Sequence, residues 1–214
     1  MAQDVPKSQP APPPAAKPSS TSSPSPISIP KSVFYINYFD QISPPHVKVL
    51  MGVCTQVITQ KKPDVLYFLF SSPGGQVDAG ITFYNFLRSL PAEIVMHNTG
   101  AIDSIGTVIF LAGDQRYAAK HSSFLFHGVQ TQFQKDSAVH PSHLRERLSR
   151  LETDESKITG IVAERSEMTE GEMRDLFQQG QAIDLATALK KKIIHEIRNP
   201  EIPKGADLVS INVN

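Results

Sequence analysis

The sequence predicts an α/β fold with a largely parallel sheet, and three observations lead to this prediction. Residues 65–70, VLYFLF, form a continuous apolar run, which is typical of a strand buried on both faces. Strand-like and helix-like segments alternate between residues 32 and 127, as they do in units with right-handed crossovers. Beyond His127 the pattern changes to one long helical segment, so we expect a long helix that projects from the sheet.

Each expected strand is rich in β-branched or aromatic residues, and each expected helix has apolar residues at three- and four-residue spacing. The expected strands are 32–39, 65–70, 94–98, 116–119 and 123–127. The first expected helix begins at Ser43 and Pro44, and three more are expected over 77–90, 100–110 and 144–162. Another helix is expected to begin at the capping-box pair Thr169 and Glu172, and the last runs from about Leu185 to the lysines 190–192. Cys54 is the single cysteine and lies on an apolar helix face, which predicts a core position and excludes a cysteine metal cluster.

Composition divides the chain into a tail and a folded part. Residues 1–30 hold nine of the 17 prolines and seven serines, which predicts a disordered tail. Residues 31–200 are then the folded domain, and residues 201–214 a C-terminal tail. The 21 basic and 21 acidic residues give zero formal charge, so no overall field favours nucleic acid or an anionic membrane. The sequence lacks a signal-peptide pattern and any run of roughly 20 apolar residues, so we expect a cytoplasmic protein with no membrane partner.

Three polar motifs lie at the ends of predicted strands, where open α/β sheets bind their ligands. The motif SSPGGQ, 71–76, follows one strand, NTGAIDSIG, 98–106, follows the next, and His127 ends a third. A Pro-Gly-Gly turn exposes backbone N–H groups that suit an oxyanion, although a glycine pair taken alone is more often a plain tight turn before a helix. The order of the three motifs along alternating strands and helices favours a catalytic site.

Ser104 and His127 are the candidate nucleophile and general base. A serine hydroxyl at a helix start lies near the positive helix end, which stabilises an alkoxide, whereas an N-cap role explains Ser104 or Asp103 equally well. A histidine at a strand end suits a general base, although a lone histidine is more often structural. His121 is a weaker candidate, because it is expected in a turn between two strands.

These motifs resemble the proteolytic subunit of Clp proteases, within the wider Clp/crotonase-like superfamily. The stretch 68–90, FLFSSPGGQVDAGITFYNFLRSL, resembles the family's strand, glycine turn and helix. The stretch 98–130 resembles its nucleophile segment and the strand that ends in the base. The resemblance covers roughly 32–199 and implies a repeated β-β-α-type core, with 31–200 as a Clp protease-like catalytic domain.

The resemblance also implies the roles of four residues. Ser104 is the nucleophile, His127 the base, and the N–H groups of Gly75 and Ile105 form the oxyanion hole. It implies no metal and no cofactor. It further implies a ring-like homo-oligomer, a peptide or unfolded protein as substrate, and an AAA+ unfoldase as a candidate partner.

The chain departs from the family pattern at the third member of the triad. Gly180 stands where the family has an Asp, so Asp184 is the replacement candidate, although a helix N-cap role is its simplest interpretation. Asp175 fits less well, because it lies on a predicted helix further upstream. The site therefore has a displaced acid, or is a Ser–His dyad, or is weak. Asp103 is a second departure, since an acid before Ser104 either favours the charged form of the base or repels acidic substrates.

Three functions remain in competition at this point. A serine endopeptidase leads. A crotonase-like acyl-CoA hydratase or isomerase is less favoured, because no glutamate lies near Ser104 or His127 in the sequence. A non-catalytic ring-forming paralogue is favoured by Gly180 and opposed by the intact serine and histidine. The apolar stripe of 142–166 and the alternating segment 131–134, TQFQ, both predict contacts with further copies of the chain.

Overall fold

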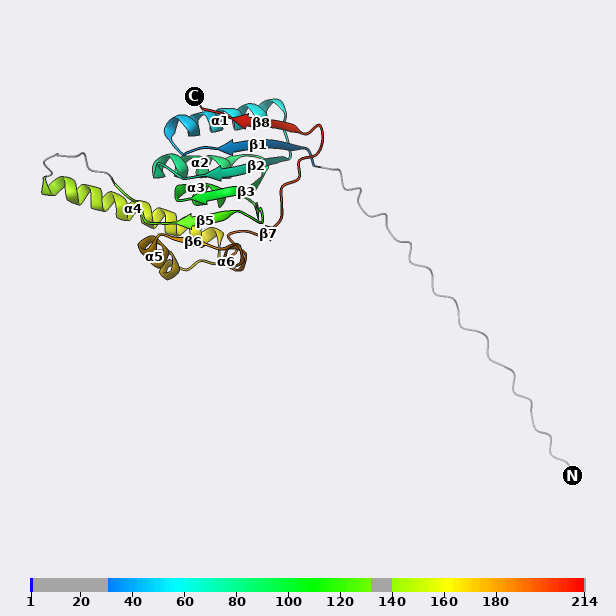
Figure 1. Cartoon of the computed structure of the whole chain (residues 1–214). Helices are drawn as coiled ribbons and strands as arrows, with labels where there is room; N and C mark the ends of the chain where they lie inside the picture. Colours follow the sequence, from blue (N-terminus) through cyan, green and yellow to red (C-terminus); the bar gives the residue numbers. More distant parts are fainter. Residues whose placement is uncertain (2–30, 132–139, 214) are drawn as a thin grey trace. The chain divides into compact units, whose positions relative to one another are not determined.

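The computed structural model describes residues 1, 31–131 and 140–213, and the described fold belongs to one compact unit that begins at Lys31. All but the first residue of the predicted proline-rich tail, 1–30, and all but the first residue of the TQFQ segment lie outside the described residues. Figure 1 shows strands and helices alternating along the unit, as the sequence predicts.

The bounds of the elements are as follows. The strands are β1 (Val33–Phe39), β2 (Val65–Ser72), β3 (Glu93–Asp103), β4 (Gln115–Ala118), β5 (Ser123–Phe126), β6 (Gln181–Ile183), β7 (Glu196–Ile197) and β8 (Asp207–Ile211). The helices are α1 (Pro44–Gln60), α2 (Val77–Ser89), α3 (Ile105–Phe110), α4 (Pro141–Arg165), α5 (Glu170–Gln179) and α6 (Leu185–Lys190). None of the helices in the described part has the length and apolar character needed to cross a membrane.

The strands form one mixed sheet in the order β6-β5-β3-β2-β1-β8, with β4 paired to β3 and β7. Every pairing is parallel except that of β5 with β6. Strand–helix–strand connections with a parallel sheet define an α/β fold, so the predicted fold class is confirmed.

The two faces of the sheet are buried in different ways. Alternate residues of each strand point to opposite faces, so one set packs with α1, α2 and α3 and the other forms a smaller cluster. All eight residues of β2 are buried, as expected of a central parallel strand. The helix-covered core includes Ile36, Phe68, Phe70, Leu50, Cys54, Phe83 and Val108, and the smaller cluster includes Tyr35, Tyr67, Leu69 and Val95.

The strand β3 is longer than predicted, which corrects the expected helix over 100–110. Residues Ala101 to Asp103 pair in parallel with β5, and the Ser71 hydroxyl donates to the Ala101 carbonyl at 2.8 Å. These interactions satisfy the backbone of the segment as a strand, so the helix begins only at Ile105.

The C-terminal segment also differs from the prediction of a tail over 201–214. Its residues Asp207 to Ile211 form β8, which pairs in parallel with β1. The alternation in this segment explains the pairing, because Val209 and Ile211 join the helix-covered core.

Two predicted helix starts behave differently. The capping box of α5 is confirmed, because the Thr169 hydroxyl accepts from the Glu172 N–H and the Glu172 carboxylate accepts from the Thr169 N–H. Hydrogen bonds from Lys191 and from the Thr169 N–H lower the pKa of Glu172 to about 2. Ser43 is the N-cap residue of α1, but its hydroxyl binds Nδ1 of His46 at 2.6 Å and makes no capping bond.

The long helix α4 is confirmed and extends away from the sheet at its N-terminal end (Figure 1). Its leucines Leu144 and Leu148 are 48% and 56% exposed, whereas Ile158 and Val162 near its other end are buried. The helix is therefore held to the domain by its C-terminal half.

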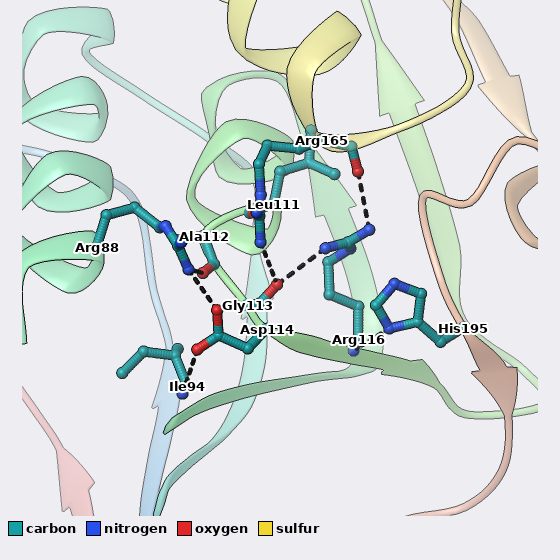
Figure 2. Close-up of polar contacts among 9 residues, drawn as sticks. All are labelled: Arg88, Ile94, Leu111, Ala112, Gly113, Asp114, Arg116, Arg165 and His195. Carbon is teal, nitrogen blue, oxygen red and sulfur yellow. Dashed lines mark hydrogen bonds and ion pairs between the residues drawn. The ribbon is translucent and has the colours of Figure 1, made fainter. Parts of the chain in front are cut away.

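An arginine cluster fixes that held end; we call Arg88, Asp114, Arg116 and Arg165 the arginine anchor (Figure 2). The buried guanidinium of Arg116 donates to four backbone carbonyls, and that of Arg165 donates to two, with the Gly113 carbonyl shared between them. Asp114 accepts from Arg88 and from the Ile94 N–H. The arginine anchor thereby ties the ends of α3 and α4 and the turn after α6 to the start of β4. The carbonyls that accept from Arg116 belong to Ile193, Gly113, Arg165 and Lys192, at 2.7–2.8 Å.

Candidate active site

Ser104 and His127 follow the ends of two neighbouring parallel strands. Asp103 of β3 pairs with Leu125 of β5, and the Ser104 N–H donates to the Leu125 carbonyl at 2.8 Å. Because both strands run in the same direction, the two residues come to the same edge of the sheet, where they line one cavity with Gly75. The sequence prediction that the three motifs lie close together is therefore confirmed.

Ser104 has an unusual backbone conformation. Its φ of 54° and ψ of −130° lie outside the regions that non-glycine residues favour, and strain of this kind clusters at functional sites. Ser104 holds the N-cap position of α3, yet its side chain makes no capping hydrogen bond. The capping interpretation of the Ser104 hydroxyl is thus wrong for the side chain, which leaves the Oγ atom available to react.

The Gly74–Gly75 turn packs directly against the serine. A Cβ atom on Gly74 would lie 2.6 Å from the Cβ of Ser104, and one on Gly75 would lie 2.0 Å from the Ile42 carbonyl oxygen, so only glycine fits at either position. The Ile42 N–H donates to the Gly74 carbonyl, and the Ile42 carbonyl accepts from the Gln76 N–H. This bridge fixes the turn while the Gly75 N–H takes no part in it. No sequence pattern indicated a role for Ile42, which comes from the loop after β1.

The second N–H group of the predicted oxyanion hole belongs to Ile105. This residue is the first of α3, and the N–H at that helical position has no acceptor within the helix. Its side chain is buried in the core, so the backbone is held firmly at this point. Gly75 and Ile105 both line the cavity that holds Ser104.

The imidazole of His127 is held by one backbone group. Its Nδ1 lies 2.8 Å from the Gly128 carbonyl oxygen, and a carbonyl can only accept, so Nδ1 carries the proton. The other ring nitrogen, Nε2, is then the basic one, which is the tautomer that a general base needs.

A cavity of about 270 Å³ surrounds these groups. Its wall has both apolar and polar parts and is built from the end of β5, the start of α2, and from α4 and α5. Sequence reasoning missed the contributions of α4 and α5, because no local pattern marks them. Besides Gly75, Ser104, Ile105 and His127, the lining includes Pro73, Val77, Phe126, Val129, Ile158 and Phe177.

The position expected for the triad acid does lie beside the histidine. Gly180 is the C-cap of α5 with a φ of 60°, and a Cβ atom there would lie 3.8 Å from the Cβ of His127. Asp184 lies elsewhere: it is exposed, and its carboxylate accepts from the Thr187 N–H at 2.6 Å as the N-cap of α6. That hydrogen bond lowers the pKa of Asp184. Asp184 and Asp175 line a second cavity, which contains neither Ser104 nor His127.

Asp103 is an acidic side chain that interacts electrostatically with the histidine. His127 lies two residues beyond Leu125, the cross-strand partner of Asp103, so both side chains start from the same face of the sheet. Burial raises the pKa of Asp103, and the electrostatic interaction with His127 acts in the opposite direction. His121 is exposed in the turn between β4 and β5 and lines no part of the cavity. Within the described residues, no three His, Cys, Asp or Glu side chains gather into a metal site.

Comparison with known proteins gives the class to which this fold belongs, a family of Clp-type peptidases. The family model for Clp protease matches residues 41–201, and the chain belongs to that family. The chain is 26% identical over 145 residues to ATP-dependent Clp protease proteolytic subunit 2 of Treponema pallidum, an alignment that covers 67% of this chain and 69% of the relative. It is 29% identical over 73 residues to the subunit 2 of Pseudomonas aeruginosa, covering 33% of this chain and 36% of that relative. Subunit 1 of Chlamydia pneumoniae is 34% identical over 64 residues, covering 29% of this chain and 34% of that relative.

Proposed function

We propose that the chain is a serine endopeptidase that cleaves peptides or unfolded proteins, with Ser104 as nucleophile and His127 as base. The observation that carries this proposal is the cavity that Ser104 and His127 share. The backbone of Ser104 is strained and its hydroxyl makes no capping hydrogen bond, while Nε2 of His127 is the basic ring nitrogen. Membership of the Clp protease family supports the same reaction class.

The reaction follows from these groups. Nε2 of His127 takes the proton of Ser104 as Oγ attacks the scissile carbonyl carbon, and the N–H groups of Gly75 and Ile105 stabilise the oxyanion. His127 then gives the proton to the leaving amine, which departs and leaves an acyl-enzyme on Ser104. A water molecule, deprotonated by the same nitrogen, releases the second product.

The cavity wall supports a preference at the cleaved bond. Val77, Phe126, Ile158 and Phe177 give the cavity an apolar side, which suits the apolar side chain of a residue next to the scissile bond. No group of the described site calls for a cofactor in this reaction.

The assembly is proposed from the exposed end of α4. Leu144 and Leu148 are about half exposed in the single chain, and pairing with another copy would cover them, which supports a ring-like homo-oligomer. Relatives named as ATP-dependent Clp protease proteolytic subunits support an AAA+ unfoldase as a partner. A cytoplasmic location is part of the same proposal. Light scattering of the full chain at micromolar concentration tests the assembly, and a monomer would contradict it.

A second function is favoured by one observation. Gly180 supplies no carboxylate beside His127. A non-catalytic ring-forming paralogue would need no such carboxylate, so this glycine favours that function. The test that separates the two is labelling with a fluorophosphonate together with hydrolysis of fluorogenic peptides. We expect the wild type to be labelled and active, and Ser104→Ala and His127→Ala to lose both properties. If the wild type and Ser104→Ala behave alike in both assays, the non-catalytic function replaces the peptidase.

A further inference from the structure

We infer that one peptide group orients His127 and that Glu155 of α4 holds this peptide in place, an inference that rests on the proposed peptidase function. The peptide joins Gly128 to Val129. Its carbonyl oxygen accepts from Nδ1 of His127 at 2.8 Å, and its N–H donates to Oε1 of Glu155 at 3.2 Å. The imidazole and a carboxylate therefore bind opposite ends of the same amide.

The neighbouring backbone is fixed as well. The Gly128 N–H donates to the Phe177 carbonyl in α5 at 3.1 Å. A Cβ atom on Gly128 would lie 3.0 Å from Oε1 of Glu155 and 3.1 Å from the Phe177 carbonyl oxygen, so a side chain here would push both apart. Two helices thus converge on the two residues that follow the base, and glycine lets them come this close.

The carboxylate affects the histidine through the amide. A hydrogen bond to a charged acceptor is about twice as strong as a neutral one, and bonds in a chain polarise one another. A negative acceptor at the N–H end makes the carbonyl oxygen more negative, so it holds the Nδ1 proton more firmly and stabilises the imidazolium. Because Gly180 occupies the usual position of the triad acid, no carboxylate binds His127 there. The Glu155–amide–His127 chain supplies part of the effect that such a carboxylate would have.

Glu155 touches no reacting atom and is therefore a positioning residue. Its substitution should lower kcat and leave KM nearly unchanged, because the serine and the apolar wall stay in place. Glu155→Ala, which removes the acceptor, should lower kcat by about 10–100-fold, which is less than the ~10⁴ lost with a directly bonded triad acid. Glu155→Gln keeps an acceptor oxygen without the charge and should lose less than tenfold.

The matched control is Glu152→Gln, one turn earlier on the same helix. Glu152 is exposed and lies outside the cavity, so this variant removes the same charge from α4 without touching the amide. We expect it to match the wild type in both kcat and KM. A loss equal to that of Glu155→Gln would overturn the inference, because the effect would then come from the net charge of α4.

A second measurement works without activity. Ring ¹⁵N shifts of His127, recorded on full chains that also carry Ser104→Ala, report which nitrogen is protonated. We expect the Nδ1–H tautomer in the parent chain, a mixture of tautomers in Glu155→Ala and an intermediate state in Glu155→Gln. Unchanged ring shifts in folded Glu155→Ala overturn the inference even when the enzyme is active. If the wild type proves inactive, the proposed function fails, and the ring shifts still decide whether Glu155 orients the histidine.

Should Glu155→Ala not fold, as judged by circular dichroism, Glu155→Gln carries the test. Its side chain has nearly the same shape and can still accept from the Val129 N–H. Wild-type kcat together with wild-type ring shifts in Glu155→Gln would show that the charge has no effect on His127, and would overturn the inference.

Discussion

The arginine anchor and the candidate active site lie at opposite ends of β3 and hold their polar groups in opposite ways. At the anchor, Arg116 is 4% exposed, and its guanidinium donates to four carbonyls. Figure 2 shows the Gly113 carbonyl, which also accepts from Arg165. At the active site, His127 is half-buried and its ring is held by one hydrogen bond to the backbone. Several hydrogen bonds therefore hold the guanidinium of Arg116, whereas a single hydrogen bond holds the imidazole of His127.

The difference separates stability from reactivity. Burial is the largest cause that lowers the pKa of Arg116, with Arg165 adding to it, yet the value stays at about 10, so the guanidinium is charged at neutral pH. A buried charge of this kind is tolerated because the guanidinium donates hydrogen bonds to four carbonyls. The base, by contrast, must change its protonation during the reaction, and a single polarisable contact permits this change.

The largest expected effect comes from breaking the anchor. Arg116→Met keeps much of the side-chain volume but removes the guanidinium donor from the carbonyls of Ile193, Arg165 and Lys192, while the Gly113 carbonyl keeps its bond from Arg165. This loss should cost about 3–5 kcal/mol of the free energy of unfolding. Urea denaturation followed by circular dichroism measures this loss. Arg116→Lys is the control, since it keeps the charge and can satisfy part of the set, and we expect an intermediate loss. A loss below about 1 kcal/mol for Arg116→Met would contradict the structural role given to the anchor.

The second expected effect comes from adding a contact to His127 at the candidate active site. Gly180→Asp puts a carboxylate next to His127, and the left-handed backbone at this position is one that Asp and Asn adopt more readily than other side chains. We expect kcat to rise by about tenfold or more, a part of the ~10⁴ associated with a triad carboxylate. Gly180→Asn is the matched control, with the same shape and no charge. Equal rates for the Asp and Asn variants would mean that the carboxylate does not reach the base.

Sequence patterns predicted the parts of the molecule that depend on neighbours along the chain. The run VLYFLF, the capping box at Thr169 and Glu172, and the buried Cys54 each follow from local periodicity or spacing, and the structure confirms them. The nucleophile segment was placed in a helix from residue 100 because small and apolar residues are ambiguous there. Pairing with β5, which no local pattern reveals, keeps Ala101–Asp103 in the strand.

The contacts that were missed join residues far apart in the sequence. Val129 meets Glu155 across 26 positions, and Arg116 meets Lys192 across 76. These bonds involve backbone groups, which leave no trace in the residue type of one partner. Gly128 is the exception that a sequence could have marked, because a glycine directly after a candidate base indicates a close approach of backbone.

The third expected effect tests Asp103 through pH. Burial raises the pKa of its carboxyl above the ordinary value, so the folded state favours the neutral form. The stability this group contributes is present below its ordinary pKa and is lost as pH rises through the folded pKa. Asp103→Asn should therefore raise Tm at pH 7 by a few degrees and match the wild type at about pH 3. The control is Asp78→Asn, an exposed acid in the first turn of α2. A lower Tm at pH 7 for Asp103→Asn would show that the charge stabilises the fold.

The smallest expected effect concerns Asp184, the acid that the sequence proposed for the triad. Its carboxylate already accepts from the Thr187 N–H, and it lines a different cavity from the one that holds His127. Asp184→Asn keeps the capping oxygen, so we expect unchanged kcat and unchanged Tm, whereas Asp184→Ala should lower Tm by a few degrees and leave kcat alone. Comparing the two variants in peptide hydrolysis and thermal unfolding separates capping from catalysis. A fall in kcat of about 10²-fold or more in Asp184→Asn, with Tm unchanged, would make Asp184 the orienting acid and would leave Glu155 with a purely structural contact.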